Sequence, residues 1–264
     1  MQQAIDFRDE SDSLYKLLVP LKDHEFEQPT QFKGWTINDV LGHLHFWNWT
    51  ADLTLKDGEA FQAFYSKLMK EVHGGSLREA EKGWRKGIMG NELLGTWREY
   101  YIEMAARFER ADPKMRLKWA GPDMSVRSSI TARLMETWAH GQEVYDTLGV
   151  KHISGDGIKN IVVLGVNTFG WTYLNRGLEV PSERPFVKLI APSGVTWEWG
   201  DASDSSYIEG QAEEFCQVVT QVRNIADTSL HLAGDVAVKW MSMAQCFAGG
   251  QEDPPAPMTR FTQV

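Results

Sequence analysis

The chain has 264 residues, of which 42% are hydrophobic and 24% are charged, values typical of a folded globular protein. Its 27 Lys and Arg side chains are outnumbered by 36 Asp and Glu, so the formal net charge is −9 at pH 7. This acidic balance lacks the basic surface that nucleic acids and anionic membranes select. No stretch approaches the ~18 apolar residues of a membrane span. We therefore expect neither nucleic acid nor a membrane as partner.

The beginning of the sequence and its cysteine content predict the compartment. Residues 1–6 show neither a cationic start nor an apolar segment, so no secretory signal is expected. Cys216 and Cys246 are the two cysteines, too few for a disulfide framework, and we expect both to be reduced and buried. These features predict a cytoplasmic protein and leave the oligomeric state open.

The first two thirds of the chain carry apolar side chains at helical spacing, which is typical of a helix bundle. The stripes predict five helices, within residues 14–21, 37–47, 93–108, 130–148 and 158–178.

After Pro181 the pattern changes to short β-favouring runs, followed by amphipathic segments. We expect strands at 186–190, 195–199 and 207–209, and helices at 210–223 and 235–247. The predicted organisation is a helical domain at 1–180, a smaller α+β domain at 181–250, and a flexible tail at 251–264.

The segment from Thr36 predicts a capped helix that carries two histidines. Thr36 is expected as the N-cap, with Asp39 completing a near capping box three residues later. On this helix the apolar side chains span an arc of roughly 120°, and His43 and His45 lie about 40° beyond its two edges. Helical geometry alone therefore does not choose between His43 and His45 as a residue that faces a cleft.

A second pair of polar residues lies on the helix predicted at 130–148. Glu136 and His140 are four residues apart, hence on one helical face, where they can bind a single divalent ion. A third ligand from His43 or His45 would leave one coordination position open, as in catalytic sites. The alternative is an ordinary surface hydrogen bond between Glu136 and His140, which is the commoner meaning of this spacing.

Two tryptophans share these helices with the possible ligands. Trp47 and Trp138 belong either to the core, as most tryptophans of this half are expected to, or to the walls of an apolar substrate pocket. The sequence contains no glycine-rich phosphate loop, nucleophile elbow or paired CxxC zinc motif.

Several of these segments resemble a known family. Gly34-Trp35-Thr36, running into His43-Leu44, resembles the metal-binding N-terminal domain of mycothiol-dependent maleylpyruvate isomerases, part of the DinB-like superfamily. Residues 119–149, with the run Ala132 to Gln142, are similar to a related metal-binding branch also labelled a wyosine-base-formation domain. Residues 210–249 resemble that branch as well, and its C-terminal part is similar to the sterol-carrier-like domain of the isomerases.

The resemblance implies both a fold and a set of ligands. The fold is an α+β chain in which an N-terminal DinB-like four-helix bundle precedes a smaller sterol-carrier-like α+β domain. The first family histidine matches His43, and the Glu and second His match Glu136 and His140. Zinc is the implied ion, although two histidines and a carboxylate also suit nickel or ferrous iron.

The resemblance further implies the chemistry. A low-molecular-weight thiol would serve as cosubstrate in a transferase or isomerase that acts on a small organic acid or similar electrophile. Arg223 is interpreted as an anion contact for that substrate. Two alternatives are a metal-dependent hydrolase or lyase that uses metal-bound water, and a non-catalytic module that binds metal and a ligand.

Overall fold

The computed structural model describes residues 1–72 and 76–263, which form two compact units, Met1–Leu148 and Gly149–Val264. Together they confirm the expected α+β class with a helical N-terminal domain. Across the described residues, none of the helices has the length and apolar character needed to cross a membrane.

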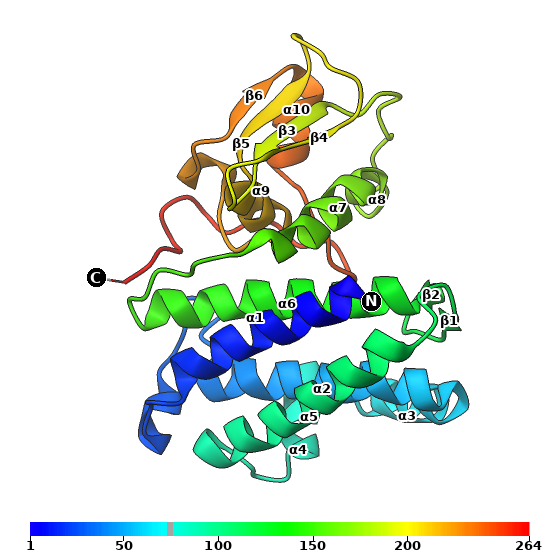
Figure 1. Cartoon of the computed structure of the whole chain (residues 1–264), viewed down its shortest axis with the longest axis vertical. Coiled ribbons are helices and arrows are strands. Elements are labelled where there is room, and N and C mark those ends of the chain that lie inside the picture. The colour runs from blue at the N-terminus through cyan, green and yellow to red at the C-terminus, as the bar shows by residue number, and fades with distance from the viewer. Residues whose placement is uncertain (73–75, 264) are drawn as a thin grey trace. The chain divides into compact units, whose positions relative to one another are not determined.

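Four long helices build the core of the first unit. They are α1 (Gln2–Leu18), α2 (Ile37–Lys56), α5 (Gly90–Arg110) and α6 (Val126–Thr147). Both α1 and α2 pack against both α5 and α6, so the four helices form a closed bundle (Figure 1). The predicted apolar stripes supply its buried side chains, among them Leu14, Leu41, Trp97 and Ile130.

Smaller elements surround this bundle. Helices α3 (Gly58–Val72) and α4 (Leu77–Trp84) were not predicted, and both pack against α2. The 3-10 turn η1 spans Asp23–Glu27, and strands β1 (Arg116–Leu117) and β2 (Met124–Ser125) form a short antiparallel hairpin before α6.

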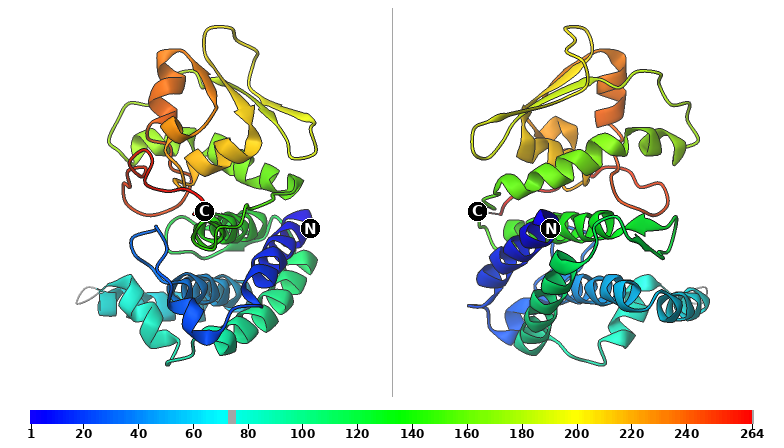
Figure 2. Two further views of the ribbon diagram at one scale, coloured as in Figure 1. Left: turned by 90° about the vertical axis from the view of Figure 1, so that its left-hand side faces the viewer. Right: turned by 45° about the vertical axis from the view of Figure 1, so that its right-hand side comes forward.

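The second unit contains a four-stranded sheet with the order β4-β3-β5-β6. Strand β3 (Phe186–Ile190) pairs antiparallel with β4 (Thr196–Trp199) and parallel with β5 (Tyr207–Gln211). Strand β6 (His231–Ala233) was not predicted and pairs antiparallel with β5. Helix α9 (Ala212–Val219) packs on β3 and β5, and α10 (Asp235–Met241) lies beside β6 (Figure 2). Both helices are shorter than their predicted ranges.

The boundary between the units lies at residues 148 and 149, whereas the sequence predicted it near 180. The 3-10 turn η2 (Asp156–Ile158) and helices α7 (Lys159–Asn167) and α8 (Phe169–Leu174) therefore belong to the second unit. Helix α7 packs closely on α9, since a Cβ added at Gly165 would lie 2.9 Å from Val219 Cγ2. An apolar stripe identifies a buried helix face but does not identify the core that covers it.

The C-terminal segment also differs from the prediction of a flexible tail at 251–264. Gln221 Nε2 donates to the carbonyl oxygen of Glu252 at 2.9 Å, and Asn224 Nδ2 donates to that of Pro255 at 2.8 Å. Arg260 Nη1 donates to the carbonyl oxygen of Gln221 at 2.9 Å. Residues 251–263 are thus tied to the second unit by long-range hydrogen bonds, while position 264 lies outside the described residues.

Candidate metal centre

The predicted cap at the start of α2 is confirmed. Asp39 N donates to Thr36 Oγ1 at 3.2 Å, and Thr36 N donates to Asp39 Oδ2 at 3.1 Å, which completes a capping box. The cap defines where α2 begins, and thereby the helical phase of His43 one turn after Asp39.

His43, Glu136 and His140 converge from α2 and α6 in the first unit. Their ligand atoms lie within 4.8 Å of one another. Glu136 Oε2 is 3.3 Å from His43 Nε2 and 3.3 Å from His140 Nε2. The side chains of His43 and His140 are 12% and 14% exposed and that of Glu136 is 25% exposed, so the cluster is mostly shielded from water.

His45 lies apart from this cluster. The structure therefore distinguishes His43 from His45, two histidines that helical periodicity could not tell apart. Its ring packs against Trp84 at 5.2 Å and Tyr100 at 5.4 Å between centroids, and the residue is 6% exposed. Burial lowers its pKa to about 4, so the imidazole is neutral at pH 7.

Glu81 on α4 is a further carboxylate in contact with the cluster. Its Oε1 lies 3.0 Å from His43 Nδ1 and accepts a hydrogen bond from Trp47 Nε1 at 2.9 Å. Trp47 thus lies beside the cluster with its indole N–H held by Glu81, and its contact with substrate stays a prediction. The His43 ring is held between two carboxylates, one at each of its nitrogens.

Aromatic side chains from the loop before α2 cover the two histidines. Trp35 stacks on His140 with ring planes 5° apart and centroids 5.7 Å apart, and its edge meets His43 at 5.3 Å. Phe32 contacts His140 edge-on at 5.1 Å. Because Lys33 and Gly34 both adopt positive φ, the loop turns sharply between the two aromatic residues.

The charges of the cluster shift the pKa values of its members. Burial disfavours the charged form of His43, but the carboxylates of Glu81 and Glu136 outweigh it and raise the pKa to about 9. Burial lowers the pKa of His140, whose hydrogen bond to Glu136 only partly opposes it. Burial alone would raise the pKa of Glu136, but the two histidines hold it well below its usual range. Glu136 is therefore an anion at neutral pH.

Arg133 adds a buried positive charge next to the cluster. It lies three residues before Glu136 on the same face of α6, and its Nε donates to Asn48 Oδ1 at 3.0 Å. Its Nη2 is buried and has no hydrogen-bond partner among the described residues. Burial lowers the pKa of this guanidinium to about 10, so it remains charged at pH 7.

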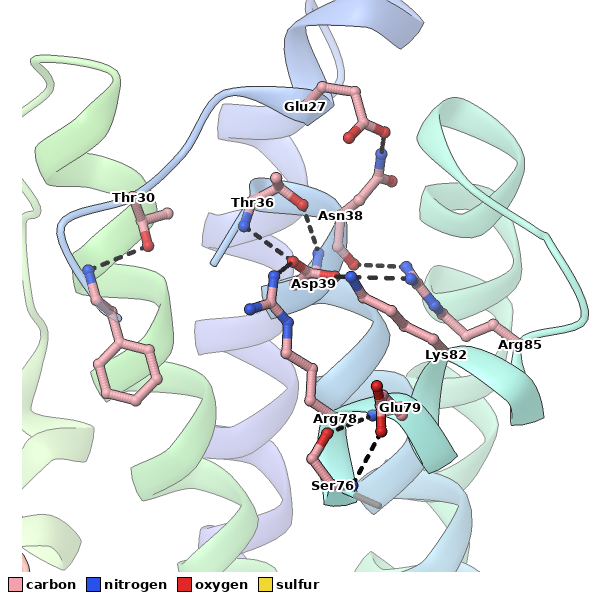
Figure 3. A network of polar contacts seen from close by, with 11 residues as sticks. Glu27, Thr30, Thr36, Asn38, Asp39, Ser76, Arg78, Glu79, Lys82 and Arg85 are labelled. Carbon is pink, nitrogen blue, oxygen red and sulfur yellow. Dashed lines mark hydrogen bonds and ion pairs between the residues drawn. The ribbon is translucent and has the colours of Figure 1, made fainter. Parts of the chain in front are cut away.

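Asp39 anchors the helix that carries Glu81 (Figure 3). The Asp39 carboxylate, 4% exposed, accepts from Arg78 and from Lys82 Nζ at 3.1 Å, and Arg85 Nη2 lies at 3.7 Å. Arg85 Nη1 also donates to the carbonyl oxygen of Asn38 at 2.8 Å. Three cations of α4 and its C-cap thus meet one carboxylate of α2.

Trp138 and Arg223 are the other two residues predicted to contact the substrate. Trp138 is 0% exposed and lies two residues from Glu136, about 200° around α6, so it belongs to the bundle core rather than to the site. Arg223 lies in the second unit, where its Nη1 donates to the carbonyl oxygen of Val222 at 2.9 Å. Its role as an anion contact stays a prediction.

Sequence reasoning missed Glu81 because it did not predict α4. A local signal was present, since Ser76 and Glu79 form a capping box in which Glu79 N donates to Ser76 Oγ at 3.2 Å. The pairing of Glu81 with His43 joins residues 38 positions apart, and no local pattern encodes it.

Sequence comparisons place the cluster inside a known domain. The family model described as the mycothiol maleylpyruvate isomerase N-terminal domain matches residues 7–145, a range that contains His43, Glu136 and His140. Proteins described as uncharacterized from two strains of Mycobacterium tuberculosis are each 36% identical over 244 residues, covering 92% of this chain and 94% of theirs.

Solved structures show the same fold. The crystal structure of mycothiol-dependent maleylpyruvate isomerase matches with a TM-score of 0.51 at 14% identity, and that of a point mutant matches with 0.52 at 15%. Each alignment covers 82% of this chain and 87% of the isomerase. The expected resemblance is thereby confirmed, while the likeness to a sterol-carrier domain stays a prediction.

Proposed function

The chain belongs to the mycothiol maleylpyruvate isomerase N-terminal domain family, and from this premise we propose that it is a metal-dependent enzyme of thiol-dependent isomerase or transferase type. Its substrate would be a small organic acid or similar electrophile, and a low-molecular-weight thiol would be the cosubstrate. The observation that carries the proposal is the convergence of His43, Glu136 and His140 within 4.8 Å.

The donor set and its spacing support a divalent ion at this point. Two ligands bonded to one zinc ion at about 2.0–2.1 Å and a tetrahedral angle lie roughly 3.3 Å apart. The separations of Glu136 Oε2 from the two histidine Nε2 atoms are both 3.3 Å. Two imidazoles and one carboxylate leave the remaining coordination position to solvent or substrate. Zinc is the ion we propose, and the same donor set also suits nickel or ferrous iron. When bound, the ion would polarise a carbonyl or lower the pKa of a thiol.

The protein's own groups suit an anionic thiolate and an anionic substrate. The Arg133 guanidinium supplies a fixed positive charge in a shielded environment, where it stabilises negative charge more than in water. Trp35 and Phe32 pack against His140 and shield part of the cluster from water.

The isomerisation needs no nucleophile from the protein. The thiolate would add to a conjugated double bond, and the displaced π electrons would form an enolate on the substrate. Rotation about the resulting single bond and elimination of the same thiolate would then regenerate the double bond in the other geometry. Cys216 and Cys246 are both buried, which agrees with a thiol supplied from outside the protein.

Calorimetric titration tests the thiol requirement. Mycothiol and glutathione would be titrated into zinc-loaded protein and into the same protein after treatment with a chelator. We expect at least one thiol to bind the loaded protein, and binding to be lost after chelation. A loaded protein that binds neither thiol would overturn the proposal and favour a hydrolase or lyase, or a ligand-binding module. S-methylated thiol is the matched control, and it should not bind.

A further inference from the structure

Two stripes of side chains meet between α2 and α4 in the first unit. On α2, Asp39, His43 and Trp47 follow one another at four-residue intervals and share one helical face. On α4 and its C-cap, Arg78, Lys82 and Arg85 share a face with Glu81, within an arc of about 100°. The cations of α4 meet Asp39, and the carboxylate of Glu81 meets both His43 and Trp47 (Figure 3 shows the Asp39 end).

Glu81 is a charged residue that is buried between α2 and α4. The residue is 4% exposed, and a carboxylate taken out of water is destabilising unless hydrogen bonds and charges compensate for the lost hydration. Its Oε1 accepts from two donors of α2, at 3.0 and 2.9 Å, so one oxygen atom holds both rings at once. A function confined to attaching α4 to α2 is already served by the three cations around Asp39.

We propose that Glu81 is the positioning residue of the metal centre. By accepting the Nδ1 proton of His43, it would leave Nε2, the ring nitrogen that faces Glu136 and His140, as the one that gives up its proton when an ion binds. Metal-binding histidines commonly donate their second ring nitrogen to a carboxylate in this way. Trp47 Nε1 restrains the carboxylate in turn. The inference rests on the proposed metal centre, to which it adds a fourth residue from a separate helix.

The arrangement makes α4 part of the site. An isolated helix of eight residues is not stable in water, so the position of Glu81 depends on the anchoring of α4 by Asp39. The centre therefore combines three ligands from two bundle helices with a positioning carboxylate from a third, docked helix.

Zinc competition against a chromophoric chelator tests the proposal, using the full chain and the variants Glu81→Ala and Glu81→Gln. Loss of the carboxylate in Glu81→Ala should weaken zinc affinity about 10–100-fold while one zinc per chain still binds at saturation. The amide oxygen of Glu81→Gln can still accept the Nδ1 proton, so this variant should retain most of the affinity. Glu103→Gln is the matched control, because the Glu103 side chain is 70% exposed. Its zinc affinity should equal that of the wild type.

A spectroscopic measurement separates positioning from general structural support. In zinc-loaded wild type, the His43 Nδ1 proton should give a downfield NMR signal that exchanges slowly with water. The signal should persist in Glu81→Gln and disappear in Glu81→Ala. Trp47→Phe, which removes only the indole donor to Glu81, provides a milder variant that should weaken zinc binding by a smaller factor.

The outcomes are distinct for the two proposals. Equal zinc affinity in wild type and both Glu81 variants would overturn the role of Glu81 and leave the metal centre intact. Absence of zinc binding in the wild type would overturn both.

Discussion

Trp35 lies over His140 with the two ring planes 5° apart, and the same indole meets His43 edge-on. One aromatic side chain from the loop before α2 thus contacts both imidazoles of the proposed centre. Phe32, three residues earlier, contacts Trp35 at 5.1 Å and His140 at 5.1 Å, so the two aromatic residues support each other.

Replacing Trp35 tests the contribution of this stacking. Trp35→Ala should lower the free energy of unfolding by about 1 kcal/mol or more, since an aromatic pair contributes roughly 0.5–1.5 kcal/mol beyond its buried area. Trp35→Phe keeps a ring over His140 and should lose less. Urea unfolding measures both values, and an Ala variant as stable as the wild type would contradict the stacking.

The Asp39 cluster predicts a large effect from a small change. Asp39→Asn removes the negative charge opposite Arg78, Lys82 and Arg85 while leaving an oxygen for the capping box. The carboxylate is buried while Arg78 and Lys82 are partly exposed, so we expect a loss of about 1–3 kcal/mol, below that of a fully buried ion pair. Asp9→Asn is the matched control, because its side chain is 62% exposed and its ion pair should contribute less than about 1 kcal/mol. Similar losses in the two variants would show that α4 is not anchored by Asp39.

Gly42 predicts a steric effect beside the proposed ligand His43. A Cβ at Gly42 would lie 2.6 Å from Arg85 Cδ and 2.9 Å from its Nη1, so Gly42→Ala must displace a buried side chain. Overpacking of this kind typically is destabilising by about 1–3 kcal/mol. Gly95→Ala, in α5, is the control: a Cβ there meets nothing within 4 Å, and better helix propensity should stabilise the protein by about 0.5–1 kcal/mol. Denaturant titration should give opposite signs for the two, and equal signs would contradict the packing of Arg85 on α2.

Asp52 predicts how stability depends on pH. Its buried carboxylate accepts from Tyr100 Oη at 2.8 Å and from Arg107 Nη2 at 2.7 Å, and Lys56 Nζ lies at 2.6 Å. Burial alone would raise the pKa of Asp52, but these partners hold it below its usual value. A depressed pKa contributes stability that is fully present above the unfolded value, near 3.9, and is lost as pH falls through the folded value.

The test compares wild type and Asp52→Asn in urea at several pH values. The wild type should be more stable by about 3 kcal/mol at pH 7, and the difference should shrink as pH falls below about 4. A difference that is constant between pH 7 and pH 3 would contradict the ionic role of Asp52.

Local patterns in the sequence predicted the elements that carry the three proposed ligands. The capping box at Thr36 and Asp39, the apolar stripes of α2 and α6, and the strands β3 to β5 follow from spacing and residue type. Periodicity left His43 and His45 equivalent because both border the apolar arc. The distinction arises from α4, which lies against His43 through Glu81 while Trp84 covers His45.

What the sequence did not predict depends on contacts between distant segments. The apolar stripe of α7 has the same helical period whether the helix joins the bundle or packs on α9. The sequence therefore predicted a domain boundary near residue 180, whereas the structure has it at residues 148 and 149. The composition of residues 251–263 does not reveal the hydrogen bonds that hold this segment. Gln221 and Asn224 donate to its backbone, and its own Arg260 donates back to the carbonyl oxygen of Gln221. Helix α4 had a capping signal but is too short for a periodic stripe to identify it.

Metal content per folded chain tests the central claim most directly. Wild type, His43→Ala, Glu136→Ala and His140→Ala would be incubated with zinc, freed of excess ion by gel filtration, and analysed by mass spectrometry of the metal. His45→Ala, altered two residues from His43 on the same helix, is the control. We predict about one zinc per chain in wild type and His45→Ala, and a large loss in each of the other three variants. Equal zinc content in all five proteins would contradict the account.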